Sequence, residues 1–401
     1  MTNNYLKPID GLRGLAILLV LMFHLEIAYF GWAGVILFFV LSGYLITKTL
    51  YTEKESSSPL KNKFRNFWAR RALRIFPLYY LYFFILLLIL IFKGLPANPE
   101  MPWLFTYSYN FYLINVYDTK GPSFLTGHLW SLSIEEQFYL FFPFFVFLFK
   151  RNQMKIAVII IIAISILFRL FFSVYEADNS SGYLDYHPFT YLDSFLFGAA
   201  VFIFKADNMK PSTVYRIFIF SALLTLLGGL YIYMEVNQGE RFSFVKYLSS
   251  FGIEAHYTKN LYRVWGLLQL NLFFSSLLLL LLLPINKGGL YWIKRIFEIK
   301  PLVSIGKMSY GMYIFHAIIV WLLLIIFNHE ITGINKYVFF VLCLGVTWFV
   351  AFAVYHLYEK RFLMLKERFR EPLVEDTGPT AISPADKGYS MAVVTNSDIK
   401  K

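Results

Sequence analysis

The sequence predicts an all-α integral membrane protein with about ten transmembrane helices and with both termini in the cytoplasm. Of the 401 residues, 58% are hydrophobic and only 15% are charged, whereas soluble domains carry about 25% charged residues. The mean hydropathy is +0.56. Apolar runs of about 18–22 residues, the length that a helix needs to cross a bilayer, recur along the chain. No alternating pattern typical of a membrane β-barrel is seen.

Composition also limits the other classes of function. The single cysteine, Cys343, lies in an apolar run, so neither a disulfide framework nor a cysteine metal site is expected. The formal net charge of +12 is typical of the cytoplasmic loops of a multi-pass protein, and we do not expect a nucleic-acid partner.

The apolar runs give the expected spans, with short or polar connections between them. Their approximate ranges are 11–30, 35–50, 78–92, 128–149, 156–174, 188–204, 217–233, 264–284, 310–327 and 337–358.

The connections alternate in charge. Those after the second, fourth, sixth and eighth runs are basic, as is the segment EKRFLMLKERFR at the end of the tenth, whereas the others are neutral or acidic. The positive-inside rule then places the basic connections and both termini in the cytoplasm. We expect a ten-helix domain over residues 1–362 in the cytoplasmic (inner) membrane. Residues 363–401 are polar and contain three prolines without periodicity, which predicts a disordered cytoplasmic tail.

The first run, DGLRGLAILLVLMFH, contains the most informative pair of residues. Asp10 is expected to cap its helix. Arg13 and His24 are eleven positions apart, which places them on one helical face about 16 Å from each other. Ionisable residues inside a membrane are candidates for a functional site, and a neutral histidine is a usable general base. The alternative is that Arg13 reaches lipid headgroups while His24 bonds to a neighbouring backbone group.

A second group is the arginine cluster at the cytoplasmic start of the third run, in FWARRALRIFP. Arg71 and Arg74 share a helical face and are joined by Arg70, which suits a multiply charged phosphate ligand. The alternative is ordinary anchoring by positive residues on the cytoplasmic side.

A third group lies in the fourth run, HLWSLSIEEQFYLFF. Glu135 and Glu136 are costly in a spanning helix, so we expect a polar cavity beside them. Adjacent helical residues point about 100° apart, so at most one of the two can share a given contact. We expect both on the outer side with His128, where an extracytoplasmic acceptor enters. His316, in the ninth run, is a further candidate, although a lone histidine there is more often a structural hydrogen-bonding residue.

Together these motifs resemble the membrane acyltransferase-3 family, the integral O-acyltransferases that modify cell-surface and exported saccharides of bacteria. The resemblance covers about residues 5–362. It depends on five segments that occur in the family's order: DGLRGLAILLVLMFH, FFVLSGYLI, RRALRIFPLYY, HLWSLSIEEQFYL and SYGMYIFH. One departure is Gly311, which stands where a second serine is expected.

The resemblance implies an acyl-CoA donor, most often acetyl-CoA, on the cytoplasmic side and an acceptor hydroxyl, usually of a sugar, on the other side. It implies that His24 is the catalytic histidine, as a general base or as the carrier of an acyl-histidine intermediate. Glu136 is the second catalytic candidate, although either glutamate could orient His24 or bind sugar hydroxyls. The expected donor-binding residues are Arg13, Arg70, Arg71 and Arg74, and the expected acceptor-binding residues are Glu135, His128, Ser42, Tyr44 and His316. No bound cofactor and no metal are expected.

Two other functions fit parts of the pattern. A flippase or transporter of lipid-linked saccharides would also have about ten spans and charges inside the membrane, but the arginine cluster beside the Arg13–His24 face favours acyl transfer. An acyltransferase acting on a lipid or small-molecule hydroxyl is the third reading. The aromatic content of 20% favours a sugar acceptor, because sugars stack on aromatic rings.

Overall fold

The computed structural model describes residues 6–94, 98–116, 119, 121–174, 181–236, 261–284, 289–327 and 334–369. Every regular element within these ranges is a helix, which confirms the all-α class. The predicted tail lies outside the described residues from position 370 onward. Its first residues, up to Phe369, are helical.

Each predicted span overlaps one long helix. The helices over residues 60–92 and 300–326 begin 18 and ten residues before the predicted starts, and the helix over residues 7–24 ends six residues before the predicted end. The long helices are α1 (Lys7–His24), α2 (Ala33–Lys54), α3 (Leu60–Phe92), α6 (Trp130–Leu148), α7 (Arg151–Val174), α9 (Pro188–Ile203), α10 (Pro211–Val236), α12 (Tyr262–Leu282), α14 (Lys300–Ile326) and α15 (Ile334–Val354).

Short helices and single turns connect them. These are η1 (Tyr29–Trp32), α4 (Met101–Phe105), α5 (Tyr109–Val116), η2 (Gly127–Leu129), α8 (Ser181–Tyr186), η3 (Ala206–Asn208), α13 (Gly289–Ile296), the π-helical turn η4 (Tyr355–Glu359), α16 (Lys360–Leu365) and η5 (Lys366–Phe369).

Eight described helices are long and apolar enough to cross a membrane. The helices at the first and sixth predicted spans, α1 and α9, are not among them. Helix α1 carries Lys7, Asp10 and Arg13 within its 18 residues, and α9 has only 16 residues. The ten-span topology and the cytoplasmic termini therefore stay predictions.

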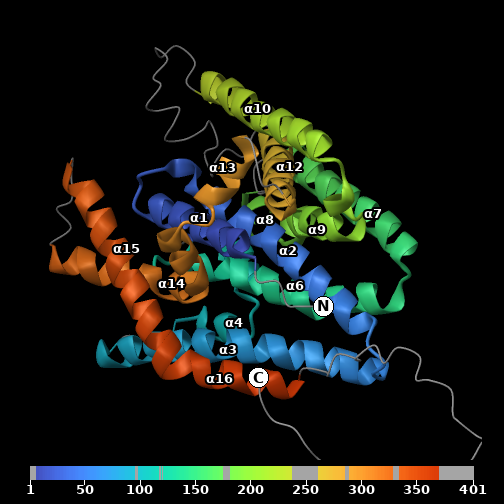
Figure 1. Ribbon diagram of the computed structural model, residues 1–401. Helices are drawn as coiled ribbons and strands as arrows, with labels where there is room; N and C mark the ends of the chain where they lie inside the picture. Colours follow the sequence, from blue (N-terminus) through green and yellow to red (C-terminus); the bar gives the residue numbers. More distant parts are fainter. Residues whose placement is uncertain are drawn as a thin grey trace, which may run out of the picture. The chain divides into compact units, whose positions relative to one another are not determined.

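Helix α1 packs against α2 on one side and α14 on another (Figure 1). Glycines permit the close approach to α14, as small residues do in membrane helix pairs. A methyl group on Gly306 would lie 1.7 Å from the Asp10 carbonyl oxygen, and one on Gly14 would lie 2.3 Å from the Leu302 carbonyl oxygen. The expected cap is wrong: the helix begins at Lys7, before Asp10, whose carboxylate lies 3.7 Å from Arg13 instead.

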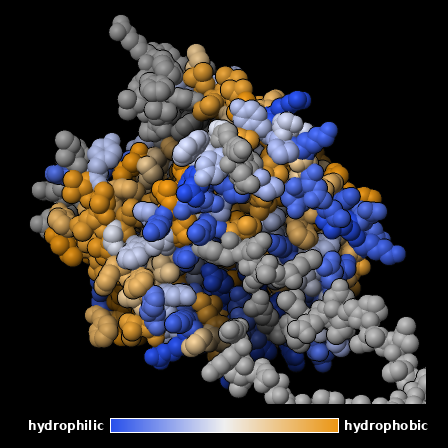
Figure 2. Space-filling model, in the orientation of Figure 1, coloured by the Kyte–Doolittle hydropathy of each residue, from blue (hydrophilic) through white to orange (hydrophobic). Residues whose placement is uncertain are grey.

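The outer helices expose the apolar side chains that a bilayer would cover. Helices α3, α7, α10 and α15 carry many exposed large hydrophobic residues, and hydrophobic side chains cover the area of α15 and α10 in Figure 2. Helix α3 runs beside α16 and η5 at one edge of the bundle (Figure 1). The central helices α1, α2, α6 and α14 surround the polar residues described next.

Candidate active site

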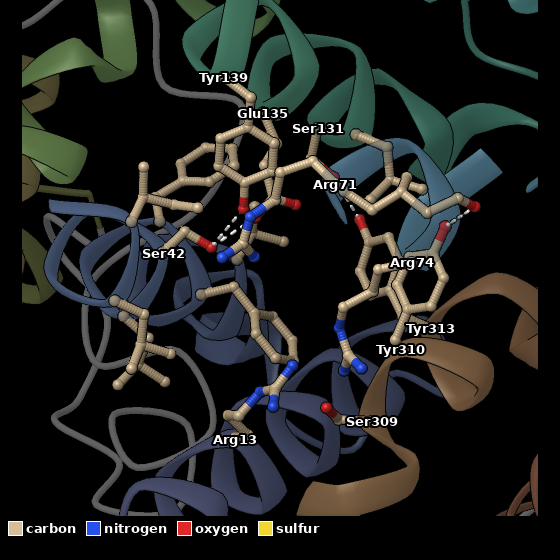
Figure 3. A pocket seen from close by; sticks show the side chains of 18 residues that line it. Arg13, Ser42, Arg71, Arg74, Ser131, Glu135, Tyr139, Ser309, Tyr310 and Tyr313 are labelled. Carbon is tan, nitrogen blue, oxygen red and sulfur yellow. Dashed lines mark hydrogen bonds between the residues drawn. The ribbon is translucent and has the colours of Figure 1, made fainter. Parts of the chain in front are cut away.

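Arginines from two helices face one cavity of about 100 Å³, which we call the arginine cavity. Arg13 comes from α1, and Arg71 and Arg74 come from α3. In Figure 3 their guanidinium groups point into the same space from different sides. The other polar residues of the lining are Ser42, Ser131, Glu135, Tyr139, Ser309, Tyr310 and Tyr313.

A hydrogen-bonded group fixes one wall of the arginine cavity. Both Ser42 and Tyr139 donate to the same carboxylate oxygen of Glu135. The Tyr139 hydroxyl also lies 3.2 Å from Ser42 Oγ. The Arg71 guanidinium lies 5.8 Å from the centre of the Tyr139 ring, within cation–π range. This wall thus orients Arg71 while the Glu135 carboxylate stays bonded to hydroxyl groups.

The positive charge of this cavity is only partly neutralised. Across the described ranges, no carboxylate lies within 4.0 Å of Arg71 or Arg74. Arg71 Nε is buried and has no hydrogen-bond partner. A buried donor without a partner is costly, and arginine is well suited to phosphate oxygens. The cavity therefore suits an anionic group with several oxygen atoms.

Arg70 does not line this cavity. Its Nη2 lies 2.5 Å from Glu53 Oε2, and its Nη1 donates to the carbonyl oxygen of Phe369 at 2.6 Å. Sequence reasoning missed another cation near the cluster, Lys366 in η5, which lies in electrostatic range of Arg70, Arg71 and Arg74. In the sequence, only the basic segment after the last span indicated a further cation here.

A second cavity, of about 370 Å³, contains two of the histidines, and we call it the histidine cavity. His24, the last residue of α1, and His128 in η2 both line it. Its other charged residues are Asp185 and Arg263, which form an ion pair. Its wall is otherwise largely aromatic, with Phe23, Trp32, Phe124, Trp130, Tyr186, Tyr191 and Tyr313. Aromatic rings beside a charged pair suit a saccharide, which offers both apolar ring faces and hydroxyl groups.

The two cavities share Val35 and Tyr313 as lining residues. Tyr313 is held firmly between them, because its hydroxyl lies 2.6 Å from Ser131 Oγ and 2.8 Å from the carbonyl oxygen of His128. Arg13 lines one cavity and His24 lines the other, at opposite ends of one face of α1.

Three histidines from different parts of the chain meet at the histidine cavity. The His316 ring of α14 lies 4.8 Å from the His24 ring and 4.7 Å from the His128 ring, centre to centre. His316 is fully buried and lies behind the cavity lining, and His128 is 4% exposed. In the part of the chain that the structure describes, no group of three or more His, Cys, Asp or Glu side chains is placed to hold a metal ion.

The remaining predicted residues lie elsewhere. Glu136 lines neither cavity, and its Oε1 is buried without a hydrogen-bond partner. Tyr44 also lines neither and packs against Phe202. Glu135 lies with the arginines and not with His128, which differs from the prediction.

The pair formed by Asp185 and Arg263 was missed by sequence reasoning. Asp185 lies in a segment interpreted as an acidic connection, and Arg263 lies at the end of a polar connection. The two residues are 78 positions apart, and no local pattern links them. The only signal was the place of Asp185 between two tyrosines, in YLDYH.

Comparisons with known proteins bear on this site. A family model described as an acyltransferase domain matches residues 6–356. Peptidoglycan O-acetyltransferase OatA of Listeria monocytogenes is 30% identical over 335 residues, which are 80% of this chain and 50% of that protein. A putative O-acetyltransferase of Staphylococcus aureus (strain COL) is 29% identical over 334 residues, 79% of this chain and 51% of that protein.

A putative peptidoglycan O-acetyltransferase of Bacillus subtilis, YrhL, is 26% identical over 381 residues, 89% of this chain and 55% of that protein. The chain thus spans about half the length of the curated relatives it matches. No solved structure matches the chain.

Proposed function

Because the chain belongs to the acyltransferase domain family, we propose that it transfers an acetyl group from cytoplasmic acetyl-CoA to a hydroxyl group of a cell-wall saccharide. The observation that carries this proposal is the pair of cavities that meet at Val35 and Tyr313, one lined by arginines and the other by histidines. The names of the relatives, peptidoglycan O-acetyltransferases, support the acetyl group and the saccharide acceptor.

The arginine cavity is the proposed entrance of the donor. Coenzyme A carries several phosphate groups, for which Arg13, Arg71 and Arg74 supply planar donors and Lys366 supplies a further charge nearby. The basic loops support a cytoplasmic position for this end of α1. The flexible pantetheine arm is long enough to run along α1 from Arg13 to His24, a helical rise of about 16 Å.

The histidine cavity is the proposed place of reaction. His24 takes the proton of the acceptor hydroxyl, and the oxygen attacks the thioester carbonyl carbon. The carbon–sulfur bond then breaks, and His24 returns its proton to the sulfur, so the products are the acetyl ester and free coenzyme A. The aromatic wall and the Asp185–Arg263 pair bind the saccharide.

In the competing mechanism, His24 itself attacks the thioester and passes the acetyl group to the acceptor in a second step. Rapid quenching of wild-type protein with labelled acetyl-CoA and no acceptor separates the two mechanisms. Label retained on the protein and absent from His24→Ala supports the acyl-histidine; its absence supports direct transfer.

The test of the function is the release of coenzyme A by the purified protein in nanodiscs, with labelled acetyl-CoA and peptidoglycan fragments. We expect release and labelled saccharide from the wild type and from His356→Ala, a histidine in the π-helical turn that lines neither cavity. We expect neither from His24→Ala. Equal turnover by His24→Ala would remove His24 from the chemistry. Saccharide binding with no acetyl-CoA binding would favour the flippase or transporter.

A further inference from the structure

We propose that His316 positions His24: its Nε2 lone pair accepts the His24 N–H that faces away from the cavity, which leaves the other His24 nitrogen free to act as the base. This inference rests on the proposed function of His24. It assigns to His316 a role behind the reacting histidine in place of contact with the acceptor.

The tautomer of His316 follows from its backbone contact. His316 Nδ1 lies 2.6 Å from the carbonyl oxygen of Tyr313. A carbonyl oxygen only accepts, so Nδ1 must carry the hydrogen, and Nε2 must carry the lone pair. Nε2 has no hydrogen-bond partner, and the residue is fully buried. Such an acceptor needs a donor from a neighbouring group.

His128 cannot be that donor. Its Nε2 lies 3.3 Å from the carbonyl oxygen of Ile314 and must therefore be its N–H. Its Nδ1 is then also an acceptor, and it is likewise buried without a partner. Two neighbouring imidazoles whose N–H groups are both committed to backbone carbonyls cannot bond to each other.

His24 is the neighbouring ring that can supply the N–H. Its ring centre lies 4.8 Å from that of His316, a separation at which facing ring nitrogens come within hydrogen-bond range after a rotation of the His24 ring. The rotation is feasible because His24 is the last residue of α1 and is only half-buried. His24 lines the cavity, whereas His316 does not.

The arrangement matches what a general base requires. A partner on the far nitrogen fixes the tautomer and the orientation of the imidazole, as the aspartate does in a serine hydrolase triad. When His24 takes the proton of the acceptor hydroxyl, the bond to His316 strengthens. A neutral imidazole supplies the hydrogen-bond acceptor without a carboxylate, whose charge would be costly inside the membrane.

Two matched substitutions separate this role from a structural one. In His316→Gln the side-chain amide reaches the position of Nε2 and keeps an acceptor there. In His316→Asn the amide reaches only the position of Nδ1 and keeps the bond to Tyr313. We expect kcat to fall about 10²-fold in His316→Asn and clearly less in His316→Gln, with the KM for acetyl-CoA and the melting temperature close to wild type in both.

Equal losses in the two variants, or a wild-type kcat in His316→Asn, would overturn the inference. If His316→Asn does not bind acetyl-CoA in a thermal-shift assay, His316→Ser takes its place. We expect the same fall of about 10²-fold in kcat for His316→Ser. The failure of the proposed function looks different, because then the wild type releases no coenzyme A or His24→Ala remains active.

Discussion

Arg70 and Glu53 form an ion pair of 2.5 Å in which neither side chain is more than 10% exposed. The next residue, Arg71, points into the arginine cavity (Figure 3). Adjacent residues of a helix point about 100° apart, so these two neighbouring arginines contact different parts of the protein. Arg70 attaches α3 to α2 and to Phe369, whereas Arg71 and Arg74 are available to a ligand.

Replacing Arg71 or Arg74 by alanine is therefore expected to raise the KM for acetyl-CoA about 10- to 100-fold, the value of one or two charge-assisted hydrogen bonds. Initial rates of coenzyme A release over a range of donor concentrations measure this. The control is Arg70→Ala, for which we expect a lower melting temperature and a KM within about threefold of wild type. A larger KM change in Arg70→Ala than in Arg71→Ala would contradict the assignment of Arg71 to the ligand and of Arg70 to the attachment of α3.

Lys366 is expected to contribute to donor binding from the other side of the cluster. Because Lys366 adds a charge near the arginines but does not line their cavity, Lys366→Ala should raise the KM for acetyl-CoA only about threefold to tenfold. The effect should decrease at high salt, since screening weakens it. Lys360→Ala, an exposed lysine of α16, is the matched control. An identical KM in both variants would exclude Lys366 from the donor site.

The sequence was sufficient to predict the helical class and most helix positions. Arg13 and His24 could be placed on one face because a single helix fixes their relation. The neighbours of Glu135 could not be predicted: it lines the arginine cavity and not the cavity of His128, because the face that a helix turns to its neighbours depends on packing between helices. The partners Arg70–Glu53 and Asp185–Arg263 could not be predicted either, since no local pattern connects residues 17 and 78 positions apart.

The ion pair of Arg169 and Asp193 was also absent from the predictions. It joins α7 to α9 at 2.6 Å, and both side chains are completely buried. Asp193→Asn leaves the guanidinium without its counter-charge, so we expect a loss of about 3–5 kcal/mol of stability. Thermal unfolding in detergent measures it, with Asp207→Asn, an exposed residue of η3, as the control. The double variant Arg169→Leu/Asp193→Leu should be less destabilised than Asp193→Leu alone. The opposite order would show that the unpaired charge of Arg169 is not the cause of the lost stability.

The contact of α1 with α14 is the feature on which both cavities depend, because α1 carries Arg13 and His24 while α14 carries Tyr313 and His316. A side chain at Gly306 would collide with the backbone of α1 at Asp10. We therefore expect Gly306→Val to lower kcat at least tenfold and to raise the KM for acetyl-CoA together, because one displacement moves both ends of α1.

The control for this substitution is Gly345→Val on α15, where an added methyl group meets nothing within 4 Å. It introduces the same side chain into a membrane helix, so it tests for the general effect of valine in place of glycine. We expect its kcat, KM and melting temperature to stay close to wild type. If Gly306→Val lowered only the melting temperature and left both kinetic constants unchanged, the spacing of α1 and α14 would matter for stability and not for the geometry of the reaction.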